Sequence, residues 1–262
     1  MSSEASDGLA GVAAWIRRAS DALVGVYNRL DVHVEAEIPD TPCLIVANHG
    51  FGTLTDLNVV ATFAALDRMG VTRDQVALVH QLAWTFRLGR IVEAFGGRPA
   101  GRETALAALA EGHHVVVFPG GDKEAGKAWR DRNTVSFHGR SGFASIARQA
   151  DVPVVPIVTA GAGDTLYVAT DGARIAEALR LPTLFRYNVA PVSISIPWGV
   201  SVGVAGLLPY LPLPAKLDTT ALAPMRPGPD EDDRTFAIRV ESTMQRAMDS
   251  MTTPGTPPVE RD

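Results

Sequence analysis

The feature that most constrains the fold of this chain is a series of short, continuous apolar runs that alternate with helical patterns. Two of these runs, CLIVAN at 43–48 and VPVVPIV at 152–158, carry no charged side chain. Strands of this kind, alternating with helices, form an α/β sheet layered by helices. The pattern predicts strands over 31–39, 43–48, 76–80, 115–118, 152–158 and 188–197, and helices over 56–69, 84–95, 103–111, 141–150 and 234–251.

Domain organisation follows from the length and the apolar content. A chain of 262 residues, 46% of them apolar, can bury one sizeable core. No internal repeat or linker divides the sequence. We therefore expect an N-terminal amphipathic helix within residues 1–30, a single α/β domain with a mixed sheet over 31–251, and a disordered tail over 252–262.

Charge and cysteine usage exclude two classes of protein. The net charge is −5, so the chain lacks the basic footprint of a nucleic-acid-binding protein. Cys43 is the only cysteine, which rules out an intramolecular disulfide and fits a reducing compartment. The polar, acidic start MSSEASDG is unlike a secretory signal, so a cytoplasmic location is expected.

One segment without charges requires separate treatment. No residue from Tyr187 to Ala215 is charged, and the run is long enough to cross a bilayer. It also contains five prolines, which would leave backbone carbonyls unpaired in hydrocarbon, so we expect no spanning helix. Its second half either docks at a membrane boundary or closes the core, and the residues concerned are Trp198, Leu207, Leu208, Tyr210, Leu211 and Leu213.

The segment GDKEAGK satisfies a phosphate-loop pattern that ends in Gly126 and Lys127. In a phosphate loop the next residue is serine or threonine, because its hydroxyl binds magnesium, but here it is Ala128. The following AWRDRNTVSFHG is too polar and aperiodic for the long helix that should hold the phosphates. A nucleotide-dependent enzyme is therefore the weakest of the functional hypotheses.

Four short blocks follow one another along the chain. They are His49 with Asp56 after CLIVAN, Gly96 with Arg102 in FGGRPAGRETA, Phe118, Pro119, Gly120 and Gly121 in VFPGGDKE, and Pro156 in VPVVPIVTAG. In this order and spacing they resemble the glycerolipid acyltransferase superfamily, which includes lysophosphatidate-type and diacylglycerol-type enzymes. The resemblance covers about residues 32–198, and FPGG with Glu124 beyond it is similar to the branch that contains neutral-lipid acyltransferases.

The resemblance implies an acyltransferase-like α/β fold that acts at the inner face of a membrane as a peripheral protein. The implied reaction moves a fatty acyl group from a coenzyme A or carrier-protein thioester to a hydroxyl of a glycerolipid or lysophospholipid. No further cofactor, metal or nucleic acid is implied. The substrate-binding residues would be Arg102 and Lys123 as phosphate contacts, and Phe118, Pro119, Gly120, Gly121 and Glu124 as the loop beside the site.

The residue types also fit acyl transfer chemically. Deprotonating a hydroxyl requires a base whose pKa lies near the working pH, which histidine provides. A carboxylate on the other ring nitrogen fixes the tautomer and stabilises the imidazolium. We expect His49 to be the base and Asp56 the orienting carboxylate, with the Gly50 and Gly52 amides as possible donors to the developing oxyanion. Asp56 is also a good helix cap.

Two departures from the family pattern are visible. Six residues separate His49 from Asp56 where the family usually has four, and Gly50 and Gly52 allow the looped turn that this requires. Gly120 stands where phosphate-acceptor members carry a glutamate. A catalytically silent lipid-binding protein of the same fold is therefore the alternative hypothesis. Of the remaining candidates, His138 and Arg140 could line the site.

Overall fold

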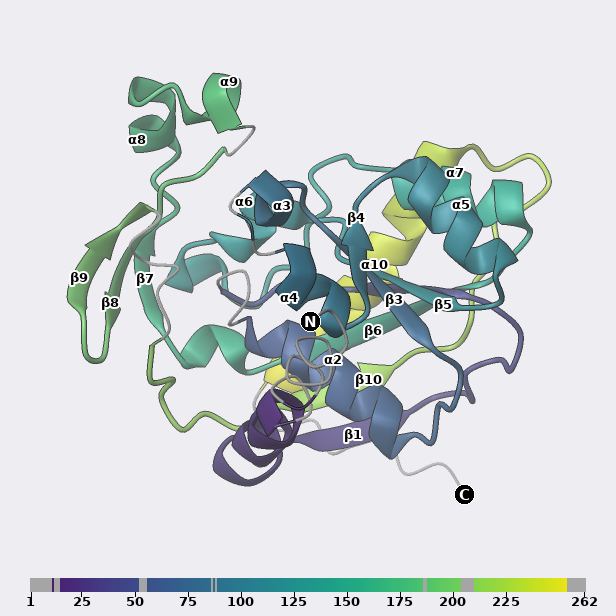
Figure 1. The fold of residues 1–262 in the computed structure, drawn as a ribbon, viewed down its shortest axis with the longest axis horizontal. Coiled ribbons are helices and arrows are strands. Elements are labelled where there is room, and N and C mark those ends of the chain that lie inside the picture. Colours follow the sequence, from purple (N-terminus) through teal and green to yellow (C-terminus); the bar gives the residue numbers. More distant parts are fainter. Residues whose placement is uncertain are drawn as a thin grey trace, which may run out of the picture.

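The computed structural model describes residues 11, 15–51, 56–85, 87, 89–185, 188–203 and 210–253. Its main sheet has seven strands in the order β1-β10-β6-β2-β5-β3-β4 (Figure 1). The strands are β1 (Asp31–Val34), β2 (Leu44–Ala47), β3 (Gln75–Val79), β4 (Gly97–Pro99), β5 (His114–Val117), β6 (Val154–Ala160) and β10 (Asp218–Ala221). From β6 to β4 all neighbours are parallel, whereas β10 is antiparallel to β6 and parallel to β1. The sheet is mixed, as expected.

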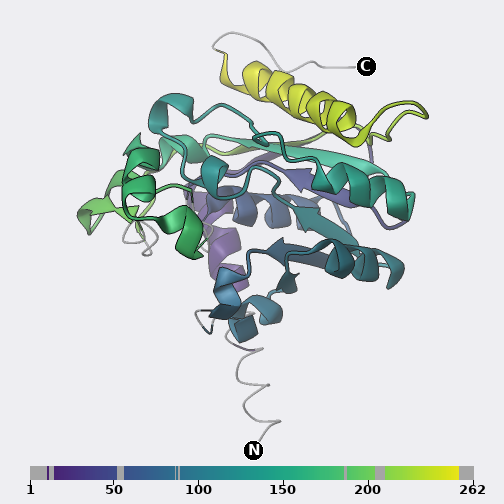
Figure 2. The ribbon, with the colours of Figure 1, turned by 90° about the horizontal axis from the view of Figure 1, so that it is seen from above.

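Helices cover both faces of this sheet (Figure 2). One face packs against α5 (Arg102–Ala110), α7 (Gly142–Ala150) and α10 (Asp233–Thr252), and the other packs against α2 (Leu57–Arg68). Successive residues of β2 point to opposite sides, so Leu44 lies in the first cluster and Ile45 in the second. Burial on both faces explains why the strands are continuous apolar runs.

A smaller antiparallel sheet lies beside the main one, at the left of Figure 1. It consists of β7 (Tyr167–Thr170), β8 (Val192–Ser195) and β9 (Gly199–Val202), and the short helices α8 (Ala173–Ala178) and α9 (Leu181–Phe185) lie between β7 and β8 in sequence. The strand predicted over 188–197 is therefore confined to four residues. No helix of the described part of the chain is both long and apolar enough to cross a membrane.

The helix predicted over 84–95 is wrong as a single element. The chain instead forms α3 (Leu82–Thr85) and α4 (Gly89–Ala94), and Arg87 between them has a φ of +61°, which a right-handed helix excludes. Gly89 faces the Trp84 ring so closely that a Cβ would overlap it, so the indole occupies the path of a straight helix. The loop predicted after it contains β4.

Four strands of the described chain, β4, β7, β9 and β10, were not predicted in the segments that contain them. β10 has the sequence DTTA, and β7 has the sequence YVAT, and each is only four residues long. Strands this short carry too little periodic signal to separate them from loops. β10 nevertheless joins β1 to β6 and completes that side of the main sheet.

The two ends of the chain follow the predictions where they are described. Residues 15–22 are helical and continue into a short π-helical segment, η1 (Leu23–Tyr27), and Val24 packs against α2. The closing helix was predicted over 234–251 and is observed as Asp233–Thr252, with Asp232 as its N-cap. The tail predicted to be disordered lies outside the described residues from 254 onward.

A first prediction tests the core beneath α10. Phe236 is fully buried and packs against Phe143 of α7, with ring centroids 6.5 Å apart. Because truncation leaves a cavity, Phe236→Ala should lower the free energy of unfolding by about 3–5 kcal/mol in urea denaturation. Ile238→Ala is the matched control on the same helix, since Ile238 is exposed, and it should change stability by less than about 1 kcal/mol. Equal losses in both variants would contradict the packing described here.

Candidate active site

The site lies at the carboxyl ends of β2, β5 and β6, which are neighbours in the main sheet. Asn48 follows β2 and is buried, and its side-chain amide donates to the Thr159 carbonyl at 3.0 Å and accepts from the Thr159 amide at 2.9 Å. The Asn58 side chain donates to the Asn48 carbonyl at 3.1 Å. These bonds tie the end of β2 to β6 and α2, so His49 extends from a fixed backbone position.

His49 and Asp56 lie within hydrogen-bonding distance in spite of their wide spacing in sequence. The Nδ1 atom of His49 is 2.7 Å from Oδ2 of Asp56. Asp56 is fully buried at the N-cap of α2, and its Oδ1 accepts the Asn58 amide at 2.8 Å. The His49 side chain is 16% exposed. The cap therefore holds the carboxylate in place, and the imidazole remains accessible.

The Gly50 amide also donates to the Asp56 carboxylate, at 3.1 Å to Oδ1. This corrects the expectation that the Gly50 amide is free to stabilise an oxyanion, because the turn uses that amide to close on Asp56. Gly52, the second expected donor, lies outside the described residues. The three N–H groups around Asp56 fix its position relative to His49.

Glu124 supports His49 from the opposite side. It lies on α6 (Gly121–Ala125), and its Oε2 accepts the His49 backbone amide at 3.1 Å while its Oε1 accepts the Ser136 amide at 3.3 Å. The side chain is 1% exposed, and this burial raises the pKa of its carboxyl, opposed by Lys127, whose Nζ is 3.8 Å from Oε1. Glu124 therefore orders this turn through backbone amides and Lys127, and its carboxylate points into the protein.

Gly120 allows this arrangement because it has no side chain. A Cβ at this position would overlap both the carboxylate and the Cβ of Glu124. Glu124 therefore fills the space beside residue 120, where phosphate-acceptor relatives were expected to carry their own glutamate. Gly121 has a φ of +57°, a left-handed conformation that favours glycine.

Arg140 pins the turn that contains Pro119 and Gly120. Its guanidinium donates to the Pro119 carbonyl at 3.1 Å and to the Gly120 carbonyl, and its other terminal nitrogen lies 2.9 Å from Oδ1 of Asp122. Burial raises the pKa of Asp122, but hydrogen bonds from Asn188 and Arg140 outweigh it and hold that pKa below its usual value. The sequence placed Arg140 near the site but did not indicate this contact.

The two expected phosphate contacts differ in their surroundings. Arg102 begins α5 and its guanidinium binds α7, with 2.7 Å to Oγ of Ser145 and 3.0 Å from Nε to Oε1 of Gln149. Lys123 is exposed. The Phe118 ring, by contrast, lies against the His49 ring with centroids 4.8 Å apart. The structure thus brings together His49, Asp56, Phe118 and Glu124, while the described contacts of Arg102 are with α7.

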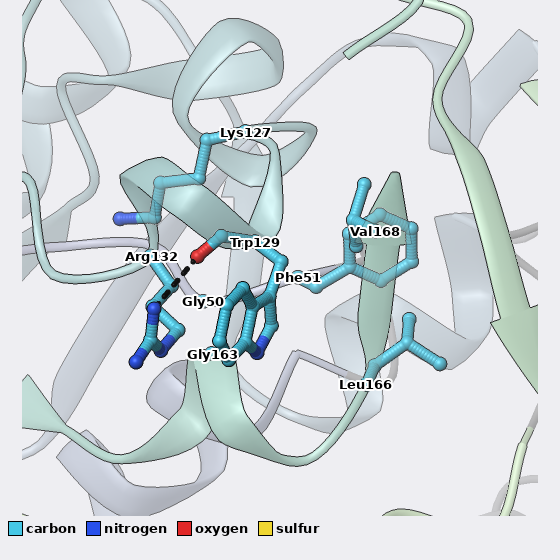
Figure 3. Close-up of a pocket in the computed structure, with 8 residues that line it drawn as sticks. All are labelled: Gly50, Phe51, Lys127, Trp129, Arg132, Gly163, Leu166 and Val168. Carbon is cyan, nitrogen blue, oxygen red and sulfur yellow. Dashed lines mark hydrogen bonds between the residues drawn. The ribbon is translucent and has the colours of Figure 1, made fainter. Parts of the chain in front are cut away.

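A small pocket lies against Gly50, the residue that follows His49 in sequence (Figure 3). One side is apolar, formed by the buried residues Phe51, Leu166 and Val168. The other side carries Trp129, with the Arg132 guanidinium 3.8 Å from the centre of its ring. The remaining lining residues are Gly50, Lys127 and Gly163. Sequence reasoning missed this pocket, because its lining comes from three separate segments, at residues 50–51, 127–132 and 163–168.

The phosphate-loop hypothesis also meets the structure in this region. GDKEAGK contains the short helix α6, and only a 3₁₀ turn, η2 (Trp129–Asp131), follows Lys127. The Nζ atom of Lys127 donates to the Thr134 carbonyl at 2.9 Å. The described geometry differs from a glycine loop that opens onto a long helix.

A second prediction tests the contact between Gly120 and Glu124. Gly120→Ala forces the carboxylate away from the His49 amide, so the free energy of unfolding should fall by about 1–3 kcal/mol and the amide resonance of His49 should shift. Urea denaturation and backbone NMR measure the two effects. Gly142→Ala is the control, because a Cβ there meets nothing within 4 Å. An unchanged His49 resonance in Gly120→Ala would contradict this assignment.

Comparison with known proteins places the chain among characterised families. The Acyltransferase family model matches residues 29–160, about half of the chain. A chicken protein named DGAT1/2-independent enzyme synthesizing storage lipids is 28% identical over 64% of this chain and 50% of its own length, and its human counterpart is 26% identical over 73% and 57%. An uncharacterised protein of Mycobacterium tuberculosis is 30% identical over 72% of this chain and 49% of its own. The chain spans about half the length of these relatives.

A solved structure shows the same fold. It is the 1-acyl-sn-glycerophosphate acyltransferase PlsC from Thermotoga maritima, with a TM-score of 0.50 and 16% identity over 93% of this chain and 83% of that one. The expected acyltransferase-like α/β fold is thereby confirmed. The family model, the fold and the named relatives agree, and the chain belongs to the acyltransferase family, within the glycerolipid acyltransferase superfamily.

Proposed function

We propose that the protein transfers a fatty acyl group from a coenzyme A or carrier-protein thioester to a hydroxyl of a glycerolipid or lysophospholipid. His49 is the general base and Asp56 orients it. The observation that carries the proposal is the 2.7 Å contact between Nδ1 of His49 and Oδ2 of the buried Asp56. This contact directs the second ring nitrogen, Nε2, to the acceptor.

In the proposed reaction Nε2 of His49 takes the hydroxyl proton while the hydroxyl oxygen attacks the thioester carbon. The C–S bond then breaks, the new ester forms, and the imidazolium returns its proton to the departing thiolate. Asp56 stabilises the imidazolium in between, as a buried carboxylate does in a catalytic triad. No covalent enzyme intermediate is needed, because the acceptor itself attacks.

The pocket beside His49 supports a substrate with an apolar part and an anionic part. Its volume is about 10 Å³, room for about one water molecule, so a substrate would contact it at its mouth and not fill it. There Phe51, Leu166 and Val168 are apolar, and Lys127 and Arg132 are cationic. Arg132 is already paired with Asp164 at 2.6 Å, so an anion would share or displace that partner. The storage-lipid name of the animal relatives favours a neutral glycerolipid as the acceptor.

The protein would act as a peripheral protein at the cytoplasmic face of a membrane, because its acceptor is a lipid.

The alternative is a lipid-binding protein of the same fold that catalyses no reaction. One measurement distinguishes it from an enzyme. Release of thiol from an acyl thioester, dependent on added acceptor, occurs only if the protein is an enzyme. Binding of acceptor without thiol release would favour the alternative.

A third prediction tests the base. His49→Ala should lower turnover by about 10²-fold or more in the thiol-release assay, the usual scale for loss of a general base. Asp56→Asn should keep the helix cap and still lose rate, because it cannot stabilise the imidazolium. His33→Ala is the control, since His33 is exposed on β1. Near-normal turnover in folded His49→Ala protein would exclude this mechanism.

A fourth prediction decides the role of Arg102. If it binds a substrate phosphate, Arg102→Ala should raise the KM for a phosphate-bearing substrate with little change in stability. Gln149→Ala removes one of the two side-chain partners of Arg102 on α7 and keeps Ser145 and the arginine, so it should leave that KM unchanged. If both variants lower stability equally and neither changes the KM, Arg102 serves only to hold α5 on α7.

A further inference from the structure

The β8–β9 hairpin of the small sheet has serine side chains inside and apolar side chains outside. Ser193 and Ser201, which lie opposite each other on β8 and β9, are 0% and 6% exposed. Their neighbours Ile194, Val200 and Val202 are 51%, 69% and 48% exposed. A half-buried sheet in a protein surrounded only by water shows the reverse alternation. The pattern indicates that the outer side of this sheet meets an apolar environment.

The exposed side chains lie in register across the sheet. Tyr167 of β7 pairs with Ile194, and Ile194 pairs with Val200, so the three share one face. An isolated bridge between Ile196 and Leu211 extends this surface beyond the strands. We call it the outer face, and it consists of Tyr167, Ile194, Ile196, Val200, Val202 and Leu211, all about half exposed or more. Trp198, half exposed, lies in the turn between β8 and β9.

The outer face is continuous with the candidate active site. The Tyr167 ring lies 6.1 Å from the ring of Trp129, and Trp129 lines the pocket beside Gly50 and Phe51. The outer face therefore adjoins the pocket through the contact between Tyr167 and Trp129.

The chemistry of this surface fits a lipid bilayer. The sequence has no charged residue from Tyr187 to Ala215, whereas Arg130, next to Trp129, has a side chain that is 84% exposed. An uncharged apolar area bounded by aromatic residues and an exposed arginine, here in an ion pair with Asp131 at 3.3 Å, is the composition of a surface that enters the headgroup region. Trp198 and Tyr167 have the ring and polar tip that this region favours.

We propose that the outer face of β7–β9 is the surface by which this protein docks on a bilayer, with Trp198 at headgroup level and the pocket opening beside it. This rests on the proposed function, because only a lipid acceptor requires the site to be at a membrane. It also revises the expectation for the uncharged run. Docking belongs to the β8–β9 hairpin, whereas Tyr210 packs against Phe51, and Leu207 and Leu208 lie outside the described residues.

The test replaces three apolar side chains by threonine, which keeps the branched shape that strands favour. The triple variant Ile194→Thr, Val200→Thr, Val202→Thr should bind vesicles of phosphatidylcholine and phosphatidylglycerol at least about tenfold more weakly than the wild type in a flotation assay. The control carries Val34→Thr, Ile91→Thr and Ile238→Thr, three exposed apolar residues elsewhere, and should bind normally. Unchanged binding of the first variant overturns the proposal.

Two further measurements keep the result decisive if the triple variant is unstable. Vesicles with brominated acyl chains should quench part of the tryptophan emission of the wild type. The quenched part should be smaller in Trp198→Phe. If the quenched fraction is the same in both proteins, Trp198 does not reach the bilayer and the proposal fails. If the wild type is a dimer that the triple variant converts to a monomer, with vesicle binding unaffected, the outer face is instead a contact between two copies.

The docking proposal and the proposed reaction are tested independently, so either can be contradicted while the other holds. Flotation and quenching need no turnover, and acyl transfer to a short-chain acceptor dissolved in water needs no docking. Loss of vesicle binding together with normal transfer to the soluble acceptor supports both proposals. Vesicle binding through the outer face without any thiol release would keep the docking surface and overturn the reaction.

Discussion

The buried carboxylate of Asp56 is the interaction on which the site depends. It accepts three N–H groups, from the His49 ring and from the Gly50 and Asn58 backbones. Two of these bonds close the turn and cap α2, and the third orients the imidazole. A fully buried charge is stable only when it is paired and hydrogen-bonded in this way. The same contacts that satisfy the charge therefore set the geometry of the histidine.

The second carboxylate of the site belongs to Glu124, which lies beside Gly120 in the FPGG block. Gly120 has no side chain, and the Glu124 carboxylate occupies the adjacent space and accepts the His49 amide. His49 is thus held between two carboxylates, since Glu124 accepts its backbone amide and Asp56, the N-cap of α2, contacts its ring. The site therefore has a carboxylate at this place even though residue 120 is glycine, because Glu124 supplies it.

A small apolar cluster connects the small sheet to the turn after His49. Phe51, Leu166 and Val168 form a small buried cluster between the main sheet and β7, and Tyr210 packs against it. This cluster joins the catalytic turn to the small sheet, which carries the proposed docking surface. Because the small sheet is attached through these side chains, its position relative to His49 follows from packing.

The sequence alone determined the α/β class, the six segments that became β1, β2, β3, β5, β6 and β8, and the pairing of His49 with Asp56. Continuous apolar runs and a helix cap are local signals, so they are readable without a structure. The tertiary structure alone decided the place of β10, the inward direction of Glu124 and the pocket that Phe51 shares with Trp129. It also decided which side of β8 faces outward. A period of two shows that Ile194 and Val200 can share a face, but only the neighbours in space determine whether that face is covered.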